Sequence, residues 1–149
     1  MIYSFSFAQN CEYQVIINSE NLKETGKFKL TILSRDAEPF KIPKQINLCN
    51  IRLTDLEIYN KTTESFEKTK LANKDIDCFT FKDKVIKLKP DKTKVYTVDI
   101  KSDFETLQET NFFKTLDNEK YRFKISFPLG SYVQCGASNN VKTDWIYKN

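Results

Sequence analysis

The stretch CFTFKDKVIKLKPDKTKVYTVDI, residues 78–100, and the stretch DNEKYRFKISFP, residues 117–128, decide the fold of this chain. In the second stretch, an apolar residue stands at every other position from Tyr121 to Phe127, and the positions between them are polar. A period of two is typical of a strand with one buried face and one face in water. The pattern predicts strands over residues 79–88, 93–100 and 121–127.

The same alternation recurs through the rest of the chain. It predicts strands over residues 12–18 and 27–34, one over 46–60 with a bulge near Thr54 and Asp55, and short strands around Phe66 and over 132–134. The spacing of Leu53, Leu56 and Tyr59 would also suit a helix, but the neighbouring strands favour the strand interpretation.

Prolines and one stretch without alternation complete the secondary-structure prediction. Pro39 and Pro43 bracket a segment that can only be a sheet edge or the start of a strand, because proline donates no ladder hydrogen bond. Pro90 begins a turn between two strands. The sequence therefore predicts an all-β fold, a single antiparallel sandwich of about 7–9 strands, with at most a short helix between Ser102 and Leu116.

Composition sets further bounds on the class of protein. The 149 residues suit one domain, and no apolar run approaches the length of about 18 residues that a membrane span needs. The 24 Lys and Arg residues against 20 Asp and Glu residues give a net charge of +4. Most lysines alternate with apolar residues, as the solvent face of strands requires, so we expect no nucleic-acid partner.

The beginning of the chain resembles the end of a secretory signal. MIYSFSFAQ carries no charged side chain, and Ser6, Phe7 and Ala8 form a small-x-small site before Gln9. We therefore expect residues 1–8 to be the remnant of a signal peptide and residues 9–149 to form the domain of a secreted or periplasmic protein. If Met1 is the true start, these residues would instead form a first strand of a cytoplasmic domain.

Four cysteines agree with export. Cys11, Cys49, Cys78 and Cys135 are widely spaced, and the chain has neither a C-x-x-C pair nor a histidine to complete a zinc site. In an oxidising compartment they would form two disulfides, whereas in the cytoplasm they would be reduced core residues. Of the three connectivities we favour Cys11 with Cys135 and Cys49 with Cys78, because the latter pair closes the shorter central loop.

The sequence argues against catalysis. Without histidine there is no Ser-His-Asp or Cys-His arrangement, and three glycines cannot build a phosphate-binding loop. Carboxylate pairs are inevitable among 20 acidic residues and carry no information. Asp75 and Asp77 could hold calcium, but a lone D-x-D in a polar loop is more often solvated. We expect no catalytic residue, cofactor or metal.

Two motifs resemble those of immunoglobulin-like sandwiches. Asp117, four residues before Tyr121, is similar to the tyrosine-corner stretch, with Phe123 where antibody domains carry a cysteine. The wider pattern, I-x-L-x-P-D-x-T over residues 86–93, then V-D-I over 98–100 and Y-x-F-x-I over 121–125, resembles small immunoglobulin-like domains of bacterial exported proteins. It is also similar to the domain preceding the catalytic part of deuterolysin-type metalloproteases. The resemblance implies a fold and an export route, and no catalytic residue.

We therefore expect an exported, non-catalytic binding protein whose partner is another protein or a glycan at the cell envelope. An inhibitor or immunity-type protein that blocks a partner enzyme is the alternative. The candidate binding residues are Tyr132, Trp145 and Tyr147, because exposed aromatic side chains carry much of the energy of interfaces. For Trp145 a place in the core is the simpler interpretation. The sequence does not indicate an oligomeric state.

Overall fold

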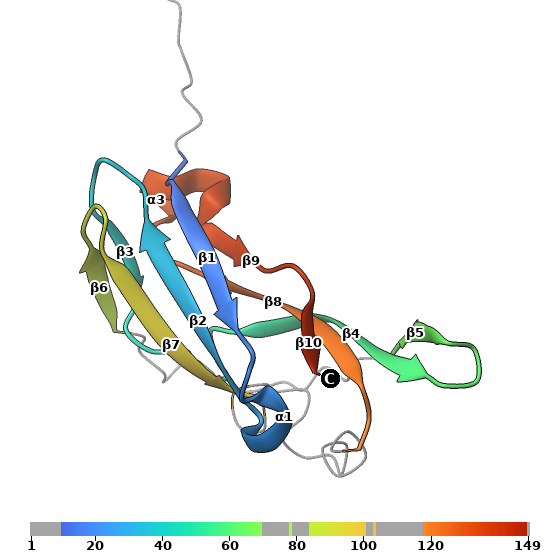
Figure 1. Ribbon diagram of the computed structural model, residues 1–149. Helices are drawn as coiled ribbons and strands as arrows, with labels where there is room; N and C mark the ends of the chain where they lie inside the picture. The colour runs from blue at the N-terminus through green and yellow to red at the C-terminus, as the bar shows by residue number, and fades with distance from the viewer. Residues whose placement is uncertain (1–9, 70–77, 79–83, 101–102, 104–117, 149) are drawn as a thin grey trace, which may run out of the picture.

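The computed structural model describes residues 10–69, 78, 84–100, 103 and 118–148 (Figure 1). The strands are β1 (Tyr13–Asn18), β2 (Lys27–Ser34), β3 (Phe40–Pro43), β4 (Arg52–Asn60), β5 (Ser65–Lys68), β6 (Val85–Leu88), β7 (Thr93–Asp99), β8 (Tyr121–Pro128), β9 (Asn140–Lys142) and β10 (Ile146–Lys148). The helical segments are α1 (Leu22–Thr25), α3 (Tyr132–Cys135) and the 3-10 turn η2 (Gly136–Asn139). The described residues are mostly strand, which confirms the predicted all-β class.

The strands form two main antiparallel sheets. The first has the order β1-β2-β7, and the second has the order β10-β8-β4-β5 with β9 also paired to β8. Strands β3 and β6 make a separate pair. Figure 1 shows β1, β2 and β7 side by side, with β4 and β8 crossing behind them. The predicted antiparallel sandwich is confirmed.

The core lies between the inner faces of the two sheets. Alternate residues of β2 and β8 are buried, as their period-two pattern predicts. The rings of Phe28 and Phe123 meet across the core with centroids 5.6 Å apart, and those of Tyr96 and Phe127 are 5.9 Å apart. The polar residues of β8 consequently point to the outer face of the second sheet.

Strand β4 contains the predicted bulge. Its register against β8 shifts between Leu53 and Asp55, so that one extra residue stands in β4. As a result Leu53 and Leu56, three positions apart, both face the core. This explains why the same residues also have a helix-like spacing in the sequence.

The two disulfides are those favoured from the sequence. Cys11 is bonded to Cys135 across 124 residues, and Cys49 is bonded to Cys78 across 29 residues. Two intramolecular disulfides suggest an oxidising, extracellular or periplasmic location. No helix among the described residues has the length and apolarity that a membrane crossing requires.

Several sequence predictions need correction or lie outside the described residues. Residues 132–134 are not a strand but part of the short helix α3. Of the strand predicted over 79–88, the structure describes Val85–Leu88 as β6, and residues 79–83 are not described. The predicted signal remnant at 1–8, the residues Asp75 and Asp77, and nearly all of the segment between Ser102 and Leu116 also lie outside the described residues.

Candidate functional site

The three candidate binding residues lie in two different places. Trp145 and Tyr147 come together around Arg122 on the outer face of the second sheet. Tyr132 lies on α3, beside the β3–β6 pair. The two places are therefore considered separately, as the Arg122 cluster (Glu57, Phe66, Arg122, Trp145 and Tyr147) and the tip (residues 130–135).

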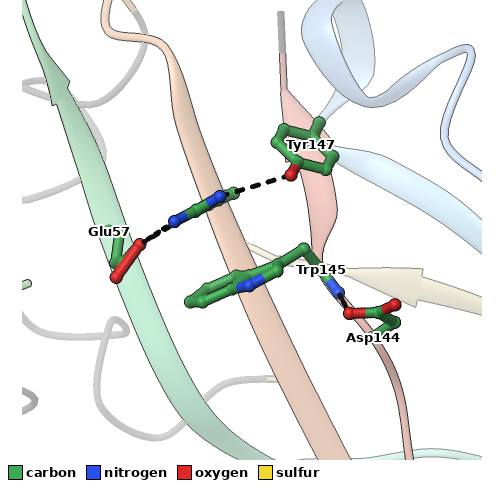
Figure 2. Close-up of polar contacts among 5 residues, drawn as sticks. Glu57, Asp144, Trp145 and Tyr147 are labelled. Carbon is green, nitrogen blue, oxygen red and sulfur yellow. Dashed lines mark hydrogen bonds and ion pairs between the residues drawn. The ribbon is translucent and has the colours of Figure 1, made fainter. Parts of the chain in front are cut away.

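The Arg122 cluster is built by cross-strand register. Glu57 on β4 and Tyr147 on β10 are the direct partners of Arg122 on β8. The guanidinium donates from Nε and Nη2 to Glu57 Oε1, at 2.8 and 2.5 Å, and from Nη1 to the Tyr147 hydroxyl at 3.3 Å (Figure 2). Its central carbon lies 4.4 Å from the ring centroid of Phe66 and 4.2 Å from that of Trp145. Cation–π contact therefore adds to the ion pair.

The electrostatics of the Arg122 cluster are largely satisfied from within. Hydrogen bonding to Glu57, and then to Tyr147, raises the pKa of Arg122 above its ordinary value. Glu57 is only 8% exposed, so its carboxylate depends on this partner. A charged ligand would have to compete with a bond already made. We infer that the cluster stabilises the pairing of β4, β8 and β10.

Trp145 is not a core residue, contrary to the simpler interpretation of the sequence. It is half-buried, and its ring lies against Arg122 and 4.7 Å from the Lys124 ammonium. Its backbone N–H donates to the Asp144 carboxylate at 2.8 Å, as Figure 2 shows. Tyr147 is 42% exposed at the margin of the same cluster.

The tip presents two apolar side chains to solvent. Tyr132 is 76% exposed and Val133 is 87% exposed, the highest values among the large exposed hydrophobic residues of the described chain. Hydrophobic residues at the surface are common singly, but two adjacent ones at this exposure form a contact patch. Exposure of such a patch to water is energetically unfavourable, and patches of this kind are typical of interfaces.

The backbone of the tip is fixed on both sides. Cys135 is joined to Cys11 by a disulfide, and the Ser131 N–H donates to Asn139 Oδ1 at 2.6 Å in a buried bond. The Ser131 hydroxyl accepts from the Lys41 N–H at 2.7 Å and donates to the Lys41 carbonyl at 2.9 Å. Gly130, with φ at +91°, permits the sharp entry into the tip. The exposed pair is thus held in one orientation.

A groove of about 940 Å³ runs beside the tip. Its lining includes Pro39, Phe40, Lys41, Lys87, Tyr132 and Val133. The groove lies between α3 and the β3–β6 pair. Gln134, which also lines it, donates from Nε2 to the Pro39 carbonyl at 2.8 Å. A partner that contacts Tyr132 and Val133 would therefore also meet these two strands.

The tip presents an apolar surface, and the described residues contain no cluster of metal-ligating side chains. Within those residues, no three Cys, Asp or Glu side chains gather as metal ligands, and the sequence has no histidine. What the tip can supply is rigid apolar contact with an aromatic residue at its centre. This arrangement suits recognition of a protein surface.

Tyr132 was a candidate from the sequence, whereas its neighbours in the tip were not. Val133 and Ser131 were not singled out, although Gly130 and Gly136 flank them and a cysteine follows closely. Two glycines and a cysteine around an apolar pair are the signal that could have indicated a fixed loop. Comparison with protein-family models, with curated proteins and with solved structures found no match.

Proposed function

We propose that this chain is an exported, non-catalytic protein-binding module, built on an immunoglobulin-like sandwich, that contacts its partner through the tip. The exposure of Tyr132 and Val133 on a segment fixed by a disulfide carries the proposal. Burying these two side chains in a partner would recover hydrophobic free energy of about 1.5–3 kcal/mol for each. A glycan is the less suitable partner, because the aromatic residues of the Arg122 cluster already contact protein cations.

Pre-organisation strengthens the case for the tip. A flexible loop loses conformational entropy when it binds, and a loop already held in its bound shape loses less. Ser131 and Cys135 restrain the two ends of the tip before any partner arrives. Tyrosine is also among the residue types that dominate measured interface energies.

Two further observations support export and the immunoglobulin-like relationship. Paired cysteines are stable in the oxidising conditions outside the cytoplasm. The pairing of β2 with β7 and of β4 with β8 follows the strand order of immunoglobulin-type sandwiches. Neither observation identifies the partner.

An inhibitor of a partner enzyme is the second candidate function. The same observation favours it, because a fixed tip with exposed apolar side chains can enter the cleft of an enzyme without first losing flexibility. In this case the tip would occupy a substrate site, and the groove beside it would contact the rim of the cleft.

The test is capture of a partner from periplasm or culture medium, followed by measurement of its affinity. Replacing both Tyr132 and Val133 by serine should weaken binding about a hundredfold, since each truncation removes an anchor worth about 1–2 kcal/mol. Val95→Ser is the matched control, because Val95 is 51% exposed on β7 and lies outside the tip.

Three outcomes of this experiment separate the candidates. A partner enzyme that loses activity in proportion to added protein would establish the inhibitor. Unchanged affinity of the tip variant would refute the tip as the contact. Glycan binding that is lost on Trp145→Ala would replace the protein partner with a glycan bound at the Arg122 cluster.

A further inference from the structure

Strand β1 is an edge strand of the first sheet in the part of the chain that the structure describes. Among the described residues it pairs only with β2. The Arg35 N–H donates to the Glu12 carbonyl at 2.9 Å, which shows that the backbone groups at the even-numbered positions of β1 face β2. In an antiparallel pair such hydrogen-bonded positions alternate with positions that point away from the partner strand. The backbone N–H and C=O groups of Tyr13, Val15 and Ile17 therefore point outward along the edge.

The edge of β3 shows how this protein protects an exposed strand. Side chains occupy its outward carbonyls: Gln134 donates to Pro39, Ser131 donates to Lys41, and Tyr96 donates to Pro43. The Lys41 N–H is also bonded to Ser131, and Pro43 has no N–H. Protection of this kind prevents unwanted strand pairing.

Strand β1 lacks the usual protection. Lysine and proline are the residues that most often block edge pairing, and neither occurs between Cys11 and Asn18. Glu12 is the one charged residue in that segment. By contrast, β6 carries Lys87 and β5 carries Lys68. The edge of β1 is also long, with 6 residues.

We propose that β1 pairs in antiparallel orientation with β1 of a second copy of this chain, which joins the two first sheets into one. A register centred on Val15 pairs the outward groups of all three residues, Tyr13, Val15 and Ile17. In this register Val15 would pair with Val15 of the second copy, while Tyr13 would pair with Ile17. Glu12 then faces Asn18, so the strand meets itself without opposing like charges.

The exposed face of β1 fits this register. Ile16 is 49% exposed, and the two copies of Ile16 would be diagonal neighbours across the new pair, within reach of each other. A groove of about 620 Å³, lined by Ile16, Ile17, Tyr147 and Lys148 among others, lies between the C-terminal half of β1 and β10. This part of the edge is therefore not covered by β10.

The test is sedimentation of the full chain over a wide range of concentration. We expect a reversible dimer. Val15→Pro should raise its dissociation constant by about tenfold or more, because proline removes an N–H that points away from β2 and is tolerated at such edge positions. Ile16→Lys should weaken the dimer similarly, through like charges on diagonal neighbours. Val95→Lys, an equivalent change on exposed residue Val95 of β7, should leave it unchanged.

Amide hydrogen exchange gives an independent readout. The amides of Tyr13, Val15 and Ile17 should exchange more slowly as the protein concentration rises, while exposed loop amides should not change. A monomer at every concentration would overturn the proposal. So would a dimer that is unaffected by both Val15→Pro and Ile16→Lys, because its interface would then lie elsewhere. Neither outcome bears on the tip, whose variants are measured against a different partner.

Discussion

Tyr96 connects the β3–β6 pair to the first sheet through one buried hydrogen bond. Its ring packs on Phe127, and its hydroxyl donates to the Pro43 carbonyl at 2.5 Å. Strand β3 has no ladder partner on that side among the described residues. The hydroxyl therefore satisfies a carbonyl that would otherwise be buried without a donor.

Tyr96→Phe should lower the free energy of unfolding by about 1–3 kcal/mol, because the Pro43 carbonyl would keep its burial and lose its donor. Urea unfolding measures the change. Tyr132→Phe is the control, since Tyr132 is 76% exposed and an exposed substitution is usually worth less than about 0.5 kcal/mol. An equal effect of both substitutions would contradict this role of the Tyr96 hydroxyl.

Burial also raises the pKa of Tyr96, and to a lesser degree that of Tyr13, above the ordinary tyrosine value of 10.0. The unfolded chain would release these protons at lower pH than the folded chain. The contribution to stability is thus complete below pH 10 and is lost as the pH rises further, by up to about 1.4 kcal/mol per pH unit for each group. Denaturant titrations at increasing alkaline pH should show this fall, and Tyr96→Phe should make it shallower.

At the scale of elements, α3 and the residue before it cover the outward backbone groups along the edge of β3. The Ser131 hydroxyl binds both backbone groups of Lys41, and Gln134 covers the Pro39 carbonyl. A four-residue helix would not be stable alone, so its position depends on these bonds and on Cys135. The tip and the strand edge consequently stabilise each other.

Ser131→Ala should cost about 1–3 kcal/mol of unfolding free energy, because two backbone groups at Lys41 lose their partner. It should also speed amide exchange at Lys41. Ser65→Ala on exposed β5 is the matched control and should change neither quantity. An unchanged exchange rate of the Lys41 amide in the Ser131→Ala variant would mean that β3 does not depend on Ser131 for protection of its edge.

The sequence predicted those elements whose pattern is set by burial on one face. Strand β2 has the predicted bounds, and the bulge of β4 lies where the alternation of Leu53 and Leu56 breaks. The tip was mistaken for a strand because Tyr132 and Gln134 alternate, whereas bonds to distant Lys41 and Cys11 fix it as a helix. Local spacing in the sequence does not indicate partners that lie so far away along the chain.

Trp145 was misplaced for a related reason. Val141 and Ile146 are both buried although five positions apart, so the two cannot belong to one unbroken strand. The chain passes from β9 to β10 between them, and Trp145 turns to the outer face. The odd spacing was visible in the sequence. The contact between Trp145 and Arg122 was not visible, because it depends on the register of β8 against β4 and β10.

At the scale of the whole molecule, the two disulfides should contribute unequally. In the chain-entropy model, closing a loop of 124 residues stabilises by about 5 kcal/mol, and closing one of 29 residues by about 3.5 kcal/mol. Replacing Cys11 and Cys135 by serine should therefore lower the unfolding free energy more than replacing Cys49 and Cys78. Urea unfolding of the two double variants measures the difference, and the reverse order would show that native-state packing outweighs loop entropy.

The bond between Cys11 and Cys135 also has a mechanical consequence. If the chain were pulled from its two ends, the force would pass directly from one cysteine to the other, and the 124-residue loop between them would bear almost none of it. Only the segments outside that loop, which include β9 and β10, could be peeled away. Until the bond is reduced, the part of the molecule between the two cysteines, which contains β1 to β8, would bear almost no tension and would stay folded.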